Sequence, residues 1–91
     1  MRRRDDPEVR SWLSKAAEDL EVVRILRKHG PALEPAICFH CQQAAEKAVK
    51  ALFVFLDRDP PRIHDLGVLA SGIRDVFPQV DAIREELSFL T

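Results

Sequence analysis

The sequence has few cysteines and glycines, no tyrosine and no long apolar run. Two cysteines cannot build the multi-disulfide framework of a small secreted domain. No segment approaches the roughly 18 apolar residues of a membrane-spanning helix. No apolar segment follows the first arginines, as one would in a secretory signal peptide. We therefore expect a cytoplasmic protein with reduced thiols and no membrane contact.

The chain also lacks a clear excess of charge of either sign. The chain has 14 Lys and Arg against 15 Asp and Glu, so its net charge is −1. No overall positive field would draw it to nucleic acid. The one basic run, residues 2–4, is followed at once by Asp5 and Asp6, and we interpret it as a solvated tail, with a phosphate-binding arm as the alternative.

The size of the chain limits it to one domain. Its 91 residues, 46% of them apolar, have room for a single small core. Such a core gives limited stability, which favours association with further helices or with a second copy. No alternating pattern indicates a strand, and the apolar residues recur at helical spacing. The expected fold class is all-α.

Capping residues and apolar spacing predict four helices. The first begins at residues 6–7, an aspartate N-cap before proline, and stops before the Gly-Pro pair at 30–31. The second spans 35–56, and the third spans 65–77. Pro78 closes the third helix and opens a fourth. The expected buried stripes are Leu13, Ala16, Ala17, Leu20, Val23 and Leu26 in the first helix; Leu66, Leu69, Ala70, Ile73 and Phe77 in the third; and Val80, Ile83, Leu87 and Leu90 in the fourth.

The fourth stripe is still apolar where the sequence stops at Thr91, without a helix stop signal. We therefore expect residues 1–91 to form a single helical domain that is truncated at its C-terminal helix.

Both cysteines lie in the second helix with the spacing C-x-x-C. On an ideal helical wheel Cys38 and Cys41 face the apolar side, whereas His40 points about 100° away from Cys41. A structural zinc site needs four ligands, and a thioredoxin-like motif needs a preceding strand. We expect buried, unreactive thiols on a face of small residues against which another helix packs closely. A redox pair and a metal site are the alternatives, and we expect neither a metal nor a cofactor.

The opposite side of this helix is polar. His40, Gln43, Lys47 and Lys50 lie there, and the two lysines could attract phosphate as flexible point charges. This face is a candidate nucleotide-binding or partner-binding surface, with a merely solvated face as the alternative. Glu46 and Lys50 are spaced for an i, i+4 ion pair, which we expect to be solvated.

Three large apolar residues interrupt that polar side, namely Phe39, Phe53 and Val54. They suggest a second buried surface, which would be either a fourth wall of the bundle or a dimer contact. Otherwise they are isolated exposed apolar residues, which are ordinary on protein surfaces.

Three stretches resemble the HEPN domain (higher eukaryotes and prokaryotes nucleotide-binding). They are FHCQQAAEKAVKAL at 39–52, PRIHDL at 61–66 and AEDL at 17–20, and the resemblance covers about residues 10–90. It implies an up-and-down bundle of four or five helices that forms a homodimer. Many prokaryotic members of the family are paired with a minimal nucleotidyltransferase, as a toxin–antitoxin or nucleotide-modifying module.

Some HEPN proteins are metal-independent ribonucleases with an R-x4–6-H motif at the dimer interface. Arg58 and His64 fit this spacing. The histidine could accept the 2′-hydroxyl proton and the arginine could hold the phosphate. The acidic Asp59 beside the arginine is unfavourable for phosphate, and in the alternative His64 and Asp65 cap the third helix.

Two functions follow from the sequence. The first is a homodimeric binding module that assists, or is modified by, a minimal nucleotidyltransferase and binds a nucleotide. The alternative is a ribonuclease toxin of a toxin–antitoxin pair that acts on RNA at the dimer interface, with Arg58 and His64 as its catalytic residues.

Overall fold

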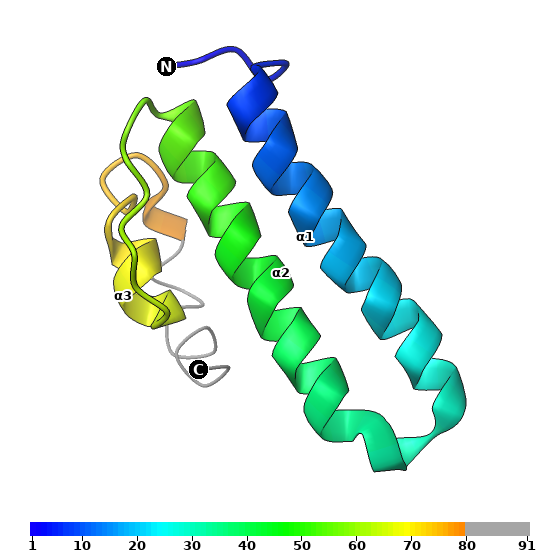
Figure 1. Cartoon of the computed structure of the whole chain (residues 1–91). Helices are drawn as coiled ribbons and strands as arrows, with labels where there is room; N and C mark the ends of the chain where they lie inside the picture. Colours follow the sequence, from blue (N-terminus) through cyan, green and yellow to red (C-terminus); the bar gives the residue numbers. More distant parts are fainter. Residues whose placement is uncertain (80–91) are drawn as a thin grey trace.

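The computed structural model describes residues 1–79, and the expected fourth helix with its stripe from Val80 to Leu90 lies outside them. Two long antiparallel helices, α1 (Pro7–Leu26) and α2 (Glu34–Phe55), form a hairpin (Figure 1). Two 3-10 turns, η1 (Arg27–His29) and η2 (Pro31–Leu33), connect them. A short helix, α3 (Leu66–Ser71), packs against α2 on the side away from α1. The described residues contain no strand, which confirms the all-α prediction.

The ends of the hairpin helices agree with the capping signals. The Asp6 carboxylate accepts hydrogen bonds from the backbone N–H groups of Glu8 (2.9 Å) and Val9 (3.3 Å), so α1 starts where predicted. Between the hairpin helices Gly30 has a φ of 85°, a left-handed conformation that glycine adopts without a steric penalty. The second helix matches its predicted bounds to within one residue at each end.

The face of α1 that meets α2 agrees with the prediction at Ala16, Val23 and Leu26 but not elsewhere. Leu13 and Leu20 are 47% and 56% exposed, and Ala17 is exposed too. The buried positions are Val9, Ala16 and Asp19, and these belong to a row with a heptad-like spacing of three and four residues. The half-buried members of that row are Trp12, Val23 and Leu26. The prediction placed the stripe around the leucines because it did not anticipate a buried carboxylate.

A second buried face of α2 meets α3. Phe53 is 5% exposed and packs with Leu66, Leu69 and Ile73, each of which is 0% exposed. The aromatic on the polar side of α2 therefore lines a wall inside this domain, as one of the two sequence alternatives proposed. Phe39, in contrast, is 53% exposed. The partly buried residues around this core are Ala45, Val49, Leu52, Leu56, Ile63 and Phe77.

The prediction of two buried thiols is wrong. Cys38 is exposed and Cys41 is half-buried. The cause is the position of α3, which packs against the C-terminal half of α2, whereas Cys38 stands near its N-terminal end. Within residues 1–79 no helix or loop packs over Cys38 in the way that α3 packs over Phe53.

The third helix is shorter than predicted. It ends at Ser71, and turns continue the chain through Val76. Gly72 caps the helix: its backbone N–H bonds to Leu69, and its carbonyl accepts a hydrogen bond from the Arg58 guanidinium (2.9 Å). The predicted apolar side of this segment is nevertheless correct, because Leu66, Leu69, Ala70 and Ile73 are buried and Phe77 is half-buried.

The N-terminal residues contact the end of α2, so Arg2 does not belong to a solvated tail. The backbone N–H of Arg2 donates to the carbonyl of Phe55 (2.7 Å), and its guanidinium donates to Asp57 (3.1 Å). Asp57 terminates α2 in the left-handed region, with a φ of 60°. Its N–H bonds to Val54 and that of Arg58 bonds to Phe53, the hydrogen-bond pattern of a Schellman motif.

Candidate functional site

A polar network crosses the seam between α1 and α2. The buried Asp19 accepts hydrogen bonds from Lys47 Nζ (2.5 Å) and from His40 Nδ1 (2.9 Å). Burial raises the pKa of Asp19, but the hydrogen bonds from Lys47 and His40 outweigh this effect and bring the pKa below its usual value. Two members of the predicted polar face therefore hold the hairpin together.

A second network fastens the loop after α2. Glu46 is 3% exposed, and its carboxylate contacts His64 Nδ1 (2.8 Å) and Lys50 Nζ (3.4 Å). The expectation of a solvated Glu46–Lys50 pair is wrong, because the Lys50 side chain is only 14% exposed. The imidazole of His64 remains 80% exposed. A buried carboxylate thus fixes one nitrogen of an otherwise accessible ring.

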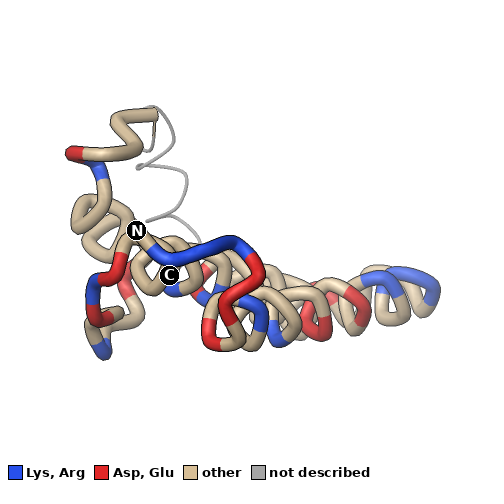
Figure 2. Tube along the Cα trace, turned by 90° about the horizontal axis from the view of Figure 1, so that it is seen from above, with Lys and Arg blue, Asp and Glu red and all other residues tan. Residues whose placement is uncertain are grey.

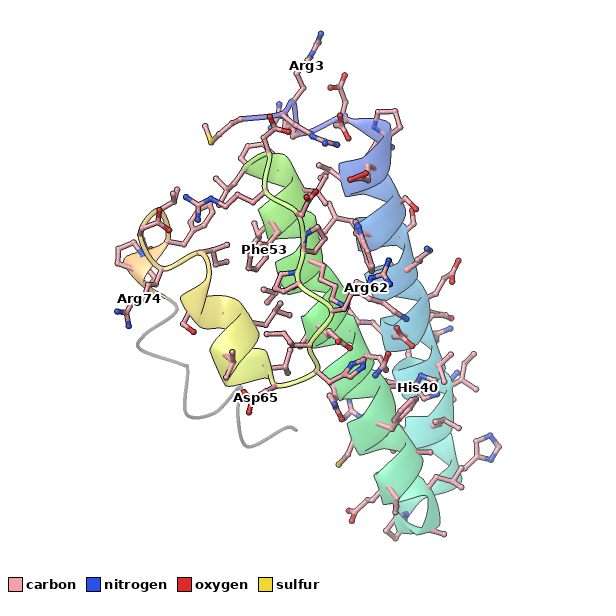
Figure 3. All side chains as sticks on the ribbon, turned by 60° about the vertical axis from the view of Figure 1, so that its left-hand side comes forward. Arg3, His40, Phe53, Arg62, Asp65 and Arg74 are labelled. Atoms are coloured by element: carbon pink, nitrogen blue, oxygen red, sulfur yellow. The ribbon has the colours of Figure 1, made fainter. Side chains whose placement is uncertain are left out.

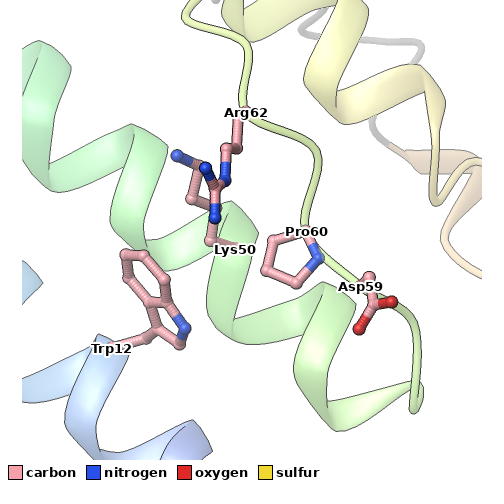
Figure 4. Close-up of a pocket in the computed structure, with 5 residues that line it drawn as sticks. All are labelled: Trp12, Lys50, Asp59, Pro60 and Arg62. Carbon is pink, nitrogen blue, oxygen red and sulfur yellow. The ribbon is translucent and has the colours of Figure 1, made fainter.

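A pocket lies beside this second network, where α1, α2 and the 57–65 loop meet. It has a volume of about 460 Å³ (Figure 4). We call it the Trp12 pocket, and its walls are Trp12 from α1, Lys50 from α2, and Asp59, Pro60 and Arg62 from the loop. Its volume lies within the range of known small-molecule sites, about 300–1,000 Å³.

Positive charge gathers around the indole of this pocket. Lys50 Nζ lies 5.6 Å from the centroid of the Trp12 ring, and Lys15 Nζ lies 5.4 Å from it. Arg62 extends over α2 from the loop (Figure 3). Elsewhere, charges of both signs are spread along the described chain (Figure 2). The Trp12 pocket therefore combines an aromatic wall with local cations on a protein without an overall positive field.

The predicted site residues divide among several places. Lys50 lines the Trp12 pocket, and His40 and Lys47 meet at Asp19. Gln43 is half-buried on α2.

Arg58 and His64 do not bond to the same group. The Arg58 guanidinium makes two hydrogen bonds to Asp75 (2.9 and 2.6 Å), besides the one to Gly72. The hydrogen bonds from Arg58 lower the pKa of Asp75 below its usual value. Within the described chain Arg58 therefore connects the end of α2 to the turns after α3 by hydrogen bonds, whereas His64 is hydrogen-bonded to Glu46.

Sequence reasoning missed three residues of these sites, namely Trp12, Asp19 and Arg62, and it expected Glu46 only as the partner of Lys50. One available signal was the spacing of Trp12 and Asp19 in the row that starts at Val9. No sequence signal identified Arg62, because the path of the 57–65 loop brings it to the pocket.

In the part of the chain that is described, no group of three or more His, Cys, Asp or Glu side chains could hold a metal ion. None of the helices in residues 1–79 has the length and apolarity to cross a membrane.

Comparison with known proteins gives one finding. The family model described as the HEPN domain matches residues 9–91, almost the whole chain. No curated protein and no solved structure matches the chain significantly.

Proposed function

The chain belongs to the HEPN domain family, and from this premise we propose that it is a binding module that takes up a nucleotide in the Trp12 pocket. The module forms a homodimer and serves a minimal nucleotidyltransferase in the cytoplasm. It does not itself carry out the chemistry.

The composition of the Trp12 pocket is the observation that carries this proposal. Lys50 and Arg62 offer cations for a phosphate, and arginine can bind one with two parallel hydrogen bonds. Trp12 offers a π surface of the kind that nucleobases stack on. Asp59 supplies a hydrogen-bond acceptor at the rim. A nucleotide contains a partner for each of these groups.

The bonds of Arg58 also favour a binding module. Its guanidinium makes three hydrogen bonds within the domain, so phosphate binding would have to break contacts that hold the turns after α3. Catalysis by an arginine–histidine pair would therefore require Arg58 to leave its bonds to Gly72 and Asp75.

The ribonuclease alternative is supported by His64. Its ring is accessible, and the contact with Glu46 orients one nitrogen, an arrangement that suits a general base. The two candidate functions thus depend on different residues and can be tested separately.

Isothermal titration calorimetry of the purified chain with AMP, GMP, CMP and UMP tests the binding module. We expect saturable binding that weakens at least about tenfold in Lys50→Gln and Arg62→Gln. The matched control is Lys28→Gln, an exposed lysine in η1, which should bind as the wild type does. An absence of nucleotide binding by the folded protein would refute the proposal.

Two further assays address the alternative and the partner. RNA incubated with the protein and a chelator should stay intact, whereas cleavage that His64→Ala abolishes would establish the ribonuclease. Co-expression with a neighbouring minimal nucleotidyltransferase should yield a complex on size-exclusion chromatography. The mass of the isolated chain on the same column tests the homodimer.

A further inference from the structure

We propose that the ligand of the Trp12 pocket is a nucleoside monophosphate whose base stacks on Trp12 in place of the Lys15 ammonium. The displaced ammonium then binds the phosphate of the same ligand. This inference rests on the proposed function and specifies the ligand and its mode of recognition.

The two lysines at the indole differ in how firmly they are held. Lys50 is nearly buried and contacts the Glu46 carboxylate (3.4 Å). Lys15 is exposed, three residues along α1 from Trp12, and none of the ion pairs within residues 1–79 includes it. Lys15 can therefore leave the ring at little cost, whereas Lys50 stays in place.

Exchange of a cation for a base is favourable at this half-buried indole, because the Lys15 cation beside it is exposed. An exposed ammonium over an aromatic ring is weakly bound because water competes for it. A nucleobase offers a whole π face and contributes more by stacking. The Lys15 ammonium still has an electrostatic partner after it leaves the ring, because the phosphate belongs to the same ligand.

The local charges select one phosphate. Three cations surround the pocket, Lys15, Lys50 and Arg62, against the two carboxylates Glu46 and Asp59. The local sum is therefore one positive charge. A phosphate monoester carries about 1.5 to 2 negative charges near neutral pH, so this excess offsets at least half of its charge. A triphosphate would bring further negative charge close to two carboxylates without compensation.

The fluorescence of the protein reports directly on this inference. Trp12 is the one tryptophan and the chain has no tyrosine, so the emission comes from the pocket. We expect AMP to quench it saturably. Adenosine, which lacks the phosphate, and ribose 5-phosphate, which lacks the base, should each bind at least about tenfold more weakly, and ATP should bind more weakly than AMP.

The Lys15→Gln variant separates displacement from simple attraction. Removing the competing ammonium should strengthen adenosine binding, whereas losing a phosphate partner should weaken AMP binding. Lys28→Gln should change neither affinity. Trp12→Phe keeps an aromatic face and should retain AMP binding by calorimetry, whereas Trp12→Leu should lose it, with circular dichroism to confirm folding.

The outcomes distinguish the two proposals. Calorimetric binding of AMP that weakens in Lys50→Gln and Arg62→Gln but leaves Trp12 emission unchanged would overturn the inference and leave the proposed function intact. Changes of the same sign for adenosine and AMP in Lys15→Gln would also overturn it. An absence of all nucleotide binding would refute the proposed function and this inference together.

Discussion

Replacement of Asp19 by asparagine tests how much the polar seam stabilises the hairpin. The variant keeps the size of the side chain but removes the charge that Lys47 and His40 share. Loss of one partner from a fully buried ion pair costs about 3–5 kcal/mol. Lys47 and His40 are 26% and 29% exposed, so both can turn toward water when Asp19 loses its charge. We therefore expect a loss of about 2 kcal/mol at neutral pH, which corresponds to a fall in Tm of roughly 10 °C.

The same network predicts a pH dependence. Because the native pKa of Asp19 is lowered, the unfolded chain takes up this proton more readily as the pH falls. The contribution to stability is complete above the pKa of an unfolded aspartate, about 4, and is lost as the pH falls through the native pKa. The difference between wild type and Asp19→Asn should therefore shrink in acid.

Urea unfolding followed by circular dichroism measures both effects. The free energies of unfolding of the two proteins are compared at neutral pH and at several values below pH 4. Glu21→Gln, on the exposed side of the same helix, removes the contact with Arg24 and should change stability little, because that pair is solvated. Equal stability of wild type and Asp19→Asn at neutral pH, or a difference that widens in acid, would refute the reasoning.

Two further perturbations follow from the core and from the thiols. A Cβ at position 72 would lie 2.5 Å from Cζ of Phe53, so Gly72→Ala should lower the free energy of unfolding by about 1–3 kcal/mol in the same urea assay. Addition of Phe53→Leu should restore part of that loss, and an additive loss would contradict the proposed clash. Titration with a thiol reagent should label the exposed Cys38 rapidly and the half-buried Cys41 slowly, and Cys38→Ser should leave only the slow phase. Equal rates for both thiols would contradict the burial described here.

Local signals predicted the helices well. The Asp6 cap, the glycine and proline after α1 and the two prolines after α2 act through backbone geometry near their own positions, so the sequence reveals them directly. The end of α3 was harder to predict. It depends on Gly72, whose carbonyl accepts a bond from Arg58, fourteen residues earlier in the chain.

The buried face of each helix was harder to predict, because two carboxylates, those of Asp19 and Glu46, are buried. A helical wheel places Glu46 on the polar arc of α2, and sequence reasoning did not count Asp19 among the buried residues of α1, since charge is costly to bury. Each carboxylate is instead compensated by groups from another element, His40 and Lys47 in one case and His64 in the other. Pairings of this kind depend on the register of the antiparallel helices, which a single helical wheel does not contain.

The candidate site was predicted only in part for a similar reason. Lys50 was chosen for its charge on α2, and the structure places it at the Trp12 pocket. Trp12 and Arg62 come from segments 38 residues before and 12 residues after it in the sequence. A site assembled from three segments has no local motif.

The left-handed Asp57 links the start of the chain to the loop that walls the pocket. Glycine would adopt this conformation without strain, but only a carboxylate there can hold the Arg2 guanidinium. Proteolytic trimming of the first few residues would remove both the backbone N–H that donates to Phe55 and the ion pair between Arg2 and Asp57. Asp59 and Pro60 follow Asp57 within three residues and form part of the rim of the pocket. Such trimming would therefore loosen the rim while leaving Trp12 in place. The contacts of Arg2 therefore connect the start of the chain to the segment that forms the rim of the pocket.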